Sequence, residues 1–506
     1  MGQISPVFGS IIPSQTQLAL QNNYLAFNAG ANDFAQQYLP EVYEAEVERY
    51  GNRTLNGFLR MVGAEMPMTS DQVIWSEQNR LHVSYTGVTL VGTAAANGNV
   101  FTFPLANGVQ NAIFANDTIV VMNPATGVTI KGVVGTSQNI AGPLASITAF
   151  TFVGNSWLTL ADPGVLAGAA NRSTSLKIFV YGSAFAKGTS QATAQGAAPA
   201  AASYKSIQPQ FTQFSNQPII IKDSFQINGS DMSQIGWVEV ATEDGTSGYL
   251  WYLKSESETR LRFDDYLEMA MVESELASGA GANSFAAGAA AGNVPGYSAA
   301  VNAHGSEGLF AAIQSRGNIL SGFSGGTGIS DFDQVLKNLD TQGAIEENML
   351  FLNRDLDLEF DDMLGQISAG QAGGTAYGLF ENSEDMALNL GFSGFRRGSY
   401  DFYKTSWKYL NDASTRGAVA VNNIEGVLIP AGTSTVYDQQ LGTNIRRPFL
   451  HVRYRASQTE DRRYKNWITG SAGGAYTTAL DAMQVNWLTE RCLVTQAANN
   501  FVLFQQ

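Results

Sequence analysis

The sequence predicts an α+β chain with an all-β module inserted toward its N-terminal end. Two patterns lead to this class. Residues 98–182 consist of short β-branched and aromatic runs separated by turn dipeptides, whereas helical and strand patterns alternate from residue 306 onward. The 506 residues are 44% hydrophobic and 11% aromatic, which is enough for several packed cores and for roughly three domain-sized modules.

The composition indicates a surface that faces other protein subunits. Only 14% of the residues are charged, against roughly 25% in ordinary soluble domains, and 52 are glycine. A charge at an interface has to be desolvated, so a low charge content suits an assembling subunit, although β-rich extracellular proteins share it. The net charge of −15 argues against a dedicated nucleic-acid binder, which needs Lys and Arg to neutralise phosphates.

Several classes are disfavoured by what the sequence lacks. The single cysteine, Cys492, excludes a disulfide framework and a thiolate metal cage. Residues 1–21 show no basic segment followed by an apolar one, so no signal peptide is expected. No run of ~18 apolar residues occurs, so no membrane span is expected either. We therefore expect the chain to fold in a reducing cytoplasm.

The N-terminal residues 1–72 are predicted to form an arm with two short helices. The first covers 41–50 and follows Pro40, a favourable first-turn residue. The second begins at Asn52 or Thr54 and ends at Gly63. Nothing in this stretch predicts a compact core of its own.

Two extended stretches, 73–90 and 205–240, are predicted to form an out-and-back β ribbon. The low-complexity segment 182–204 precedes the returning stretch. Because a two-stranded ribbon is only marginally stable alone, it is expected to lie on a neighbouring subunit. Between the two stretches, residues 91–185 are predicted to form a small sandwich or barrel. Its predicted strands include Thr118–Met122, Val128–Val134, Ile147–Val153 and Leu176–Tyr181.

The longest helical pattern covers Ser247–Ala277, where a helix would span roughly 45 Å. A Gly/Ala-rich loop is expected over 278–300, and Ser330 is expected to cap a helix. A further helix running to Met363 is acidic, and its Asp355, Asp357, Asp361 and Asp362 are interpreted as a solvated face. The predicted strands are Met349–Leu352, Val427–Pro430, Phe449–Arg455, Met483–Trp487 and Leu493–Leu503.

The search for catalytic chemistry is negative. Gly322 to Gly326 fits G-x-S-x-G around Ser324, but a nucleophile elbow needs a strand directly before the serine and a helix directly after it. A flexible loop is therefore favoured over a hydrolase built on Ser324. His82, His304 and His451 lie far apart and are interpreted as packing or surface residues. The sequence thus predicts no catalytic, cofactor or metal site, and no enzyme.

One charge feature stands out. The stretch from Arg446 to Lys465 contains seven Lys/Arg and only two acids, Glu460 and Asp461, so its local net charge is +5. A solvated strand pair explains this as well as an ion-pair interface with acidic segments of neighbouring copies, such as Glu41–Glu48 or Asp355–Asp362. Charge reversal at Arg453 and Arg455 should weaken assembly if the interface exists. The candidate inter-subunit pairs are Arg446, Arg447, Arg453, Arg455, Arg462 and Arg463 with Glu41, Glu44, Glu46 and Glu48.

The ordered set of elements resembles the major capsid protein of tailed bacteriophages, the Hong Kong ninety-seven fold, and looks most like that of crAss-like phages of gut Bacteroidales. Trp75–Arg80 and Gln210–Ser230 resemble the two strands of the family's E-loop, and the helix that ends near Glu275 resembles its spine helix. The central A-domain and the peripheral domain are matched by Gly308–Gly317, Ser330–Leu339, Gly426–Pro430, Trp467–Gly470 and Thr489–Leu493.

The resemblance implies a division of the chain. It comprises an arm (1–72), E-loop strands (73–90 and 205–240), an inserted all-β module (91–185), spine helix and peripheral domain (241–305), axial domain (306–440) and closing peripheral strands (441–506). Some relatives cross-link a Lys to an Asn, but Lys187, near the expected loop tip, is interpreted as an ordinary exposed lysine.

The resemblance also implies a role. Hexamers and pentamers would build an icosahedral head around double-stranded DNA, which is enclosed without sequence-specific binding. The partners would be copies of the chain together with portal, scaffolding and head accessory proteins. Assembly would occur in the host cytoplasm and the product would be a virion, with no membrane and no cofactor. The alternatives are an encapsulin-like compartment shell and a secreted β-rich adhesin.

Overall fold

A computed structural model gives the structure of the chain, and its described residues begin at Glu65. The helices predicted over 41–63 and the loop serine Ser324 lie outside the described residues. The described ranges are 65–77, 82–91, 100–105, 111–140, 144–162, 171–188, 192–194, 202–204, 212–233, 240–241, 247–248, 251–277, 283–297, 304–323, 329–342, 345–370, 377–379, 393–412, 414–419, 423–438, 443–474 and 476–506.

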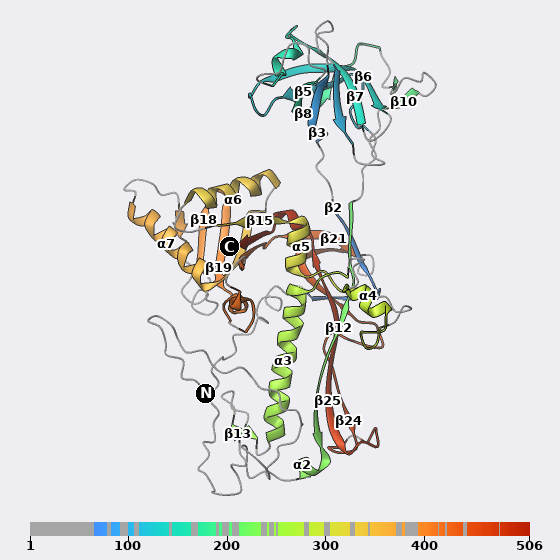
Figure 1. The fold of residues 1–506 in the computed structure, drawn as a ribbon, viewed down its shortest axis with the longest axis vertical. Helices are drawn as coiled ribbons and strands as arrows, with labels where there is room; N and C mark the ends of the chain where they lie inside the picture. The colour runs from blue at the N-terminus through green and yellow to red at the C-terminus, as the bar shows by residue number, and fades with distance from the viewer. Residues whose placement is uncertain are drawn as a thin grey trace. The chain divides into compact units, whose positions relative to one another are not determined.

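The chain divides into two compact units. Residues 1–75 and 214–506 form one unit, here called the body, and residues 76–213 form the other, here called the barrel unit. The chain leaves and re-enters the body through β2 (Val73–Glu77) and β11 (Thr212–Asn216), which pair with each other (Figure 1). The described ribbon is therefore shorter than the predicted one.

The barrel unit is a closed barrel of six strands, in the order β3-β4-β7-β6-β5-β8. Each predicted strand run in this region overlaps an observed strand. The barrel starts earlier than expected, because the alternating residues near Val88 pair with β4 and β8 instead of extending the ribbon. Its strands are β3 (Ser84–Val91), β4 (Val100–Pro104), β5 (Asp117–Met122), β6 (Thr129–Ile140), β7 (Leu144–Thr151) and β8 (Asn171–Ser183).

Alternating side chains of the strands fill the interior of the barrel. Every second side chain of the strands points inward, as Ile119 and Val121 on β5 do, and the interior is apolar. Trp157, in the 3₁₀ turn Trp157–Leu160, meets Phe101 edge to face at 5.1 Å. Its indole N–H donates to the Ala149 carbonyl at 3.0 Å, so its polar atom is satisfied inside the core.

The body's first sheet is built around β25 (Ala482–Thr495), a single strand where the sequence predicted two separate ones. β12 (Ile219–Asn228) pairs along one edge of β25, and β24 (Lys465–Gly470) and β23 (Leu450–Arg455) share the other edge. β1 (Glu65–Met68) adds to β23 in parallel. β25 is one continuous strand because partners on both of its edges hold its central residues extended.

The predicted long helix is α3 (Trp251–Glu273), shorter at both ends than expected. It lies along β12 and β25 (Figure 1). Phe263 and Leu267 of α3 pack on Val485 and Trp487 of β25 in one buried cluster. α3 therefore covers one face of this sheet.

The body's second sheet has seven strands, in the order β15-β26-β20-β16-β19-β18-β17. Helices α6 (Ile329–Gln342) and α7 (Arg354–Gly370) pack on one face, where they share a buried aromatic cluster with the strands (Figure 1). A second cluster joins other strand residues of the sheet to α5 (Leu309–Arg316). The strands are β15 (Asn318–Ser321), β16 (Glu347–Leu352), β17 (Tyr377–Leu379), β18 (Ser393–Arg397), β19 (Tyr400–Ser406), β20 (Ile424–Pro430) and β26 (Val502–Gln505).

Three local predictions were wrong. α6 begins at Ile329, so Ser330 lies in its first turn and does not cap it. The expected Gly/Ala-rich loop contains a short helix, α4 (Phe285–Ala290), whose cap Ser284 accepts a hydrogen bond from Ala287 N at 3.2 Å. The expected solvated acidic face is interrupted, because Asp357 is buried.

The remaining elements are short. None of the helices that the structure describes is long and apolar enough to cross a membrane. The short elements are β9 (Ala192–Ala194), β10 (Ala202–Tyr204), α2 (Gly229–Ser233), β13 (Val240–Ala241), β14 (Ser247–Gly248), α9 (Lys408–Asn411), η3 (Arg416–Ala418), β21 (Thr433–Asp438), β22 (Thr443–Pro448) and η4 (Ala498–Asn500).

Candidate functional site

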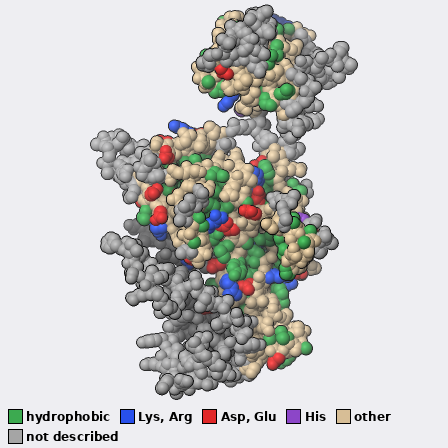
Figure 2. All heavy atoms as spheres, in the orientation of Figure 1, with side chains coloured by type: hydrophobic (Ala, Val, Ile, Leu, Met, Phe, Trp, Pro, Cys, Tyr) green, Lys and Arg blue, Asp and Glu red, His purple; other side chains and the backbone are tan. Residues whose placement is uncertain are grey.

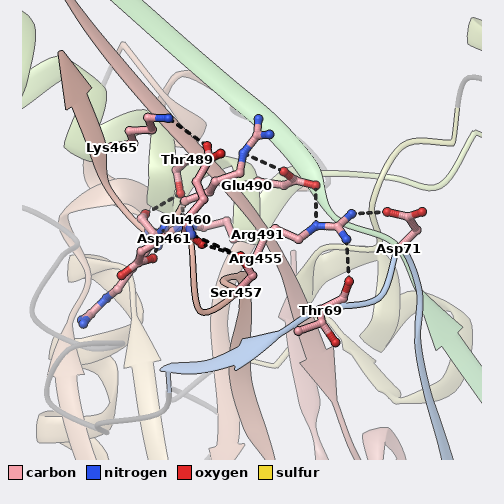
Figure 3. A network of polar contacts seen from close by, with 12 residues as sticks. Thr69, Asp71, Arg455, Ser457, Glu460, Asp461, Lys465, Thr489, Glu490 and Arg491 are labelled. Atoms are coloured by element: carbon pink, nitrogen blue, oxygen red, sulfur yellow. Dashed lines mark hydrogen bonds and ion pairs between the residues drawn. The ribbon is translucent and has the colours of Figure 1, made fainter.

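The part of the arginine-rich run from Arg453 to Lys465 lies in the β25 sheet, on β23, β24 and the connection between them, whereas Arg446 and Arg447 lie on β22, which pairs with β21 in a separate sheet. In the β25 sheet the run meets carboxylates from β1, β25 and the segment after β1. We call the group the edge cluster, and Figure 3 shows part of it. Its members are Glu65, Asp71, Arg455, Arg462, Arg463, Glu490 and Arg491.

Strand pairing places two arginines beside β1. Met66 lies opposite Arg453 and Met68 lies opposite Arg455 in the parallel register. Arg453 Nη1 donates to the Pro67 carbonyl at 3.2 Å. Arg455 Nη1 donates to the Thr69 carbonyl at 2.8 Å (Figure 3). The guanidinium groups thereby satisfy carbonyls at an edge strand of only four residues.

Glu490 is the centre of the cluster. It is buried on β25, and its two oxygens lie 3.1 Å from Arg455 Nε and 2.9 Å from Arg462 Nε. Arg455 also pairs with exposed Asp71; this hydrogen bond raises the pKa of Arg455 and lowers the pKa of the Asp71 carboxyl. Glu490 therefore ties β23 to the segment that precedes β24, whereas the exposed Asp71 contact adds little stability.

Glu65 neutralises a buried guanidinium. Its oxygens lie 2.5 Å from Arg463 Nε and 3.3 Å from Arg491 Nη1. Arg491 is 6% exposed, and burial lowers its pKa while the charge of Glu65 acts in the opposite direction. The remaining donors of Arg491 reach Thr489 Oγ1 at 3.0 Å and the Arg463 carbonyl at 2.9 Å. The cluster is thus a largely satisfied network of charges at the start of the described chain.

Replacing Glu65 with glutamine should loosen β1 without unfolding the body. The isostere keeps the shape but removes the charge opposite Arg491, a loss of about 1.5–3 kcal/mol for hydrogen bonds to a charged group. Amide exchange of residues 65–68 should then accelerate by roughly ten- to hundred-fold, since each 1.4 kcal/mol is tenfold. Hydrogen exchange with mass spectrometry measures this. Glu460→Gln, which removes an exposed pair with Lys465, is the control and should leave β1 unchanged.

The structure brings together only part of the predicted site. Arg455, Arg462 and Arg463 have carboxylate partners within their own chain. The side chains of Arg446 and Arg447 on β22, and the acids Glu41, Glu44, Glu46 and Glu48, lie outside what the structure describes. Pairing between copies therefore stays a prediction.

Sequence reasoning missed the partners of the arginines. Glu65 and Glu490 lie far from the run in sequence, so no local spacing links them to it. One signal was present: Glu490 and Arg491 are adjacent charges inside the apolar strand β25, flanked by Leu488 and Leu493. Charges in a buried strand normally have a partner.

A second polar anchor fixes the base of the ribbon. Asn216, 1% exposed, donates its amide to the carbonyls of Leu493 at 2.6 Å and Glu307 at 2.9 Å. Its oxygen accepts from Glu307 N at 2.8 Å, and Arg316 pairs with the Glu307 carboxylate at 2.5 Å. The Arg316 guanidinium also lies 4.6 Å from the ring centre of Phe214. The returning strand is thereby held to β25 and to the residues before α5.

The histidines and the cysteine lie in different environments. His451 is buried with Nδ1 3.0 Å from the Pro448 carbonyl, whereas His82 and His304 are exposed. Burial raises the pKa of the Cys492 thiol to about 12, which makes it a poor nucleophile. Among the described residues, no group of three or more His, Cys, Asp or Glu side chains could hold a metal ion.

The face of the β25 sheet opposite α3 is partly exposed: Leu488 and Glu490 of β25 are buried there, whereas described side chains of β12 and β24 are exposed. Along β12 the side chains alternate, with Ile221 and Phe225 in the cluster under α3 and Ile220, Lys222 and Ser224 exposed. Ile220 is 52% exposed. Trp467 on β24 and Ser224 on β12 both lie opposite Asn486 of β25, so they are on the same face of the sheet. Trp467 is 37% exposed. We call this surface the open face.

Comparisons with known proteins give structural matches only. No family model and no curated protein sequence matches the chain. A solved structure from Microbacterium phage Oxtober96 matches at 9% identity and a TM-score of 0.36, covering 92% of this chain and 95% of that one. One from Gordonia phage Cozz matches at 8% identity and a TM-score of 0.30, covering 59% and 74%.

A third match is the capsid of a native GTA particle. It has 10% identity and a TM-score of 0.30, and it covers 61% of this chain and 79% of the other. Two of these matched structures thus come from phages and the third is a capsid, and all three have TM-scores of 0.36 or less.

Proposed function

We propose that this chain is the major capsid protein of a tailed bacteriophage, a structural subunit and not an enzyme. Copies would form hexamers and pentamers of an icosahedral head. The observation that supports this most is the open face of the β25 sheet, where Ile220 and Trp467 are exposed on a long sheet whose other face is covered by α3. Exposed apolar side chains of this kind mark surfaces that bind other proteins.

The distribution of charge supports the same proposal. On the part of the body drawn in colour, charged side chains are scattered among hydrophobic and uncharged surface (Figure 2). Such a surface can be covered by neighbours without a large desolvation cost. In a closed shell each modest contact recurs by symmetry, so weak individual interfaces give a stable assembly.

The enclosed material would be double-stranded DNA held without specific contacts. The net charge of −15 suits a wall that surrounds DNA and does not adhere to it. Portal, scaffolding and head accessory proteins would be the other partners. The assembled product would be a virion formed in the host cytoplasm.

Ion pairs between copies remain part of the proposal. Arg446 and Arg447 on β22, together with Arg453 of the edge cluster's strand, would meet the acids between Glu41 and Glu48 of a neighbour. Because Arg455 already pairs with Glu490, its reversal would also disturb its own chain. Charge reversal at Arg446 and Arg447 is therefore the cleaner test.

Electron microscopy of the full chain, expressed with and without a candidate scaffolding protein, tests the function. Closed shells of repeated hexamers and pentamers are expected. A chain that stays a cooperatively melting monomer at high concentration would reject the proposal. Shells that hold an enzyme cargo in place of DNA would favour the compartment-shell alternative.

Ile220→Lys should reduce shell formation about tenfold or more while the chain stays folded. A buried isoleucine contributes about 1.5–3 kcal/mol, and a lysine at the same contact adds a charge that must be desolvated. Sedimentation of assembled and free chain measures the yield. Leu358→Lys is the matched control, because Leu358 on α7 is also 52% exposed. Equal losses in both variants would show that added charge alone, and not the open face, limits assembly.

A further inference from the structure

The two units of the chain carry opposite net charges. Residues 76–213 contain six Lys/Arg and three Asp/Glu, a net charge of +3. The rest of the chain contains the other 23 Lys/Arg and 41 Asp/Glu, a net charge of −18. The barrel unit is therefore a cationic module within an acidic protein.

The acids of the barrel are used inside it. Asp117 is 1% exposed and accepts from Phe114 N at 2.8 Å. One oxygen of Asp162 accepts from Asn123 Nδ2 and Ser173 Oγ, both at 2.9 Å. The third acid, Glu77, lies on β2, outside the barrel strands. The described outer surface of the barrel strands therefore carries lysines without exposed carboxylates.

Two lysines and four aromatic residues share one side of the barrel, here called the barrel face. Val121 lies opposite Ile130 on β6 and Ile178 on β8, and all three point into the core. The neighbouring row, in which Val120 lies opposite Lys131 and Phe179, therefore points outward. The barrel face is made of Lys131, Lys177, Phe150, Phe152, Phe179 and Tyr181.

The same alternation places the other members. Lys177 lies opposite Met122 and is exposed. Phe150 lies opposite Val133 on β6 and is 54% exposed, as is Phe152 just beyond β7. Tyr181 is 51% exposed on β8. β7 with the residues just beyond it and β8 thus present aromatic side chains, and β6 and β8 add lysines. This is the composition of an interface with aromatic anchors.

We propose that the barrel face docks onto the acidic body of a second copy of this chain. This rests on the proposed shell function, which supplies neighbouring bodies at high local concentration. The charge of the body complements that of the face, and the aromatic side chains provide apolar area to bury.

A nucleic acid fits this face less well. Binding to a phosphate backbone gains its affinity from many Lys and Arg contacts, typically six to ten phosphates per site. The barrel face offers two lysines, and its other members are aromatic. A protein surface with dispersed carboxylates matches that ratio better.

Zero-length cross-linking of assembled full-length chain tests the contact. Particles are assembled from equal amounts of ¹⁴N- and ¹⁵N-labelled chain and treated with a carbodiimide, which joins lysines to carboxylates in contact. Mixed-isotope peptides that link Lys131 or Lys177 to an acid of residues 214–506 are expected. Particles whose mixed-isotope links omit both lysines would overturn this proposal and leave the shell function standing. Failure of the chain to assemble at all would overturn both.

Charge and aromatic variants give a second measurement. Lys131→Glu and Phe150→Ser are each expected to lower the yield of particles or the salt concentration at which half of the particles dissociate. For Lys131→Glu the expected loss of yield is about tenfold, because the new carboxylate would meet the carboxylates of the neighbouring body. Lys187→Glu, the same charge change in the same unit beyond the end of β8, is the control. Equal effects of Lys131→Glu and Lys187→Glu would show that only net charge matters and would overturn the docking proposal. If the barrel face became buried only after a different protein or a polyanion was added, the docking proposal would be overturned as well.

Discussion

Replacing Lys404 with methionine is expected to destabilise the second sheet of the body by about 3–5 kcal/mol, the cost of removing one partner from a buried ion pair. Lys404 is 3% exposed on β19. Its ammonium donates to Asp357 Oδ1 at 2.8 Å and to the Asp357 carbonyl at 3.2 Å, and it lies 2.6 Å from Asp361 Oδ1. All three donors are thus used, and methionine would leave Asp357 with only the largely exposed Arg354, whose Nη1 lies 3.1 Å from Asp357 Oδ2.

Hydrogen exchange of β16 and β19 measures this loss locally, which matters because a chain of two units need not unfold in one step. Protection there should fall by roughly hundred- to thousand-fold, at tenfold per 1.4 kcal/mol. The double variant Lys404→Met with Asp357→Leu should recover much of it, because a well-packed apolar pair can replace a buried ion pair. Lys337→Met, at an exposed position of α6, should change nothing. A single variant as stable as the parent would show that Arg354 alone is enough to satisfy Asp357.

This buried pair also illustrates what the sequence could not provide. The sequence predicted an acidic helix running to Met363, whereas α7 continues to Gly370, and the density of acids suggested a solvated face. Lys404 lies 47 residues from Asp357, on a strand whose neighbours are set by sheet order. Since no local pattern encodes that pairing, the partner of Asp357 could only come from the structure.

The same distinction between local and distant information explains the strands. The β5 and β16 runs were predicted because residue type and turn signals suffice for a short buried strand. β3 was assigned to the ribbon because alternation is the same in a ribbon and in a barrel; only its pairing with β4 and β8 separates them. β25 was split because Thr489 to Arg491 interrupt its apolar pattern, although partners on both edges keep it extended.

The residues of the edge cluster also fall into those that the sequence could predict and those that it could not. The arginines of the edge cluster were found because they gather within one stretch of sequence, from Arg446 to Lys465. Glu65 and Glu490 were not, because they reach the run through β1 and β25. Their presence changes the interpretation of the run: much of its charge is already neutralised within the chain, which leaves fewer cations for contacts between copies.

Truncating Phe332 to alanine is expected to cost about 3–5 kcal/mol, the range for removing a large aromatic side chain from a core. Phe332 is fully buried on α6, and its ring meets those of Phe360 at 5.7 Å, Phe395 at 5.7 Å and Phe402 at 5.1 Å. One side chain thus joins α6 to α7 and to two strands, so the cavity would open at the point where the helix layer meets the sheet.

The neighbouring aromatic rings cannot collapse into that cavity without leaving their own contacts, because Phe360 also stacks on Phe323 at 5.2 Å and Phe395 on Phe402 at 5.2 Å. The cost should therefore lie toward the upper end of the range, and Phe332→Leu should lose much less because it fills most of the space. Hydrogen exchange of α6 and β18 reports the loss, with Lys337→Ala as the control on the exposed side of the same helix. If Phe332→Ala exchanged no faster than Lys337→Ala, the two helices would be held to the sheet by the ion pair of Arg397 with Asp333 and other polar contacts, not by this core.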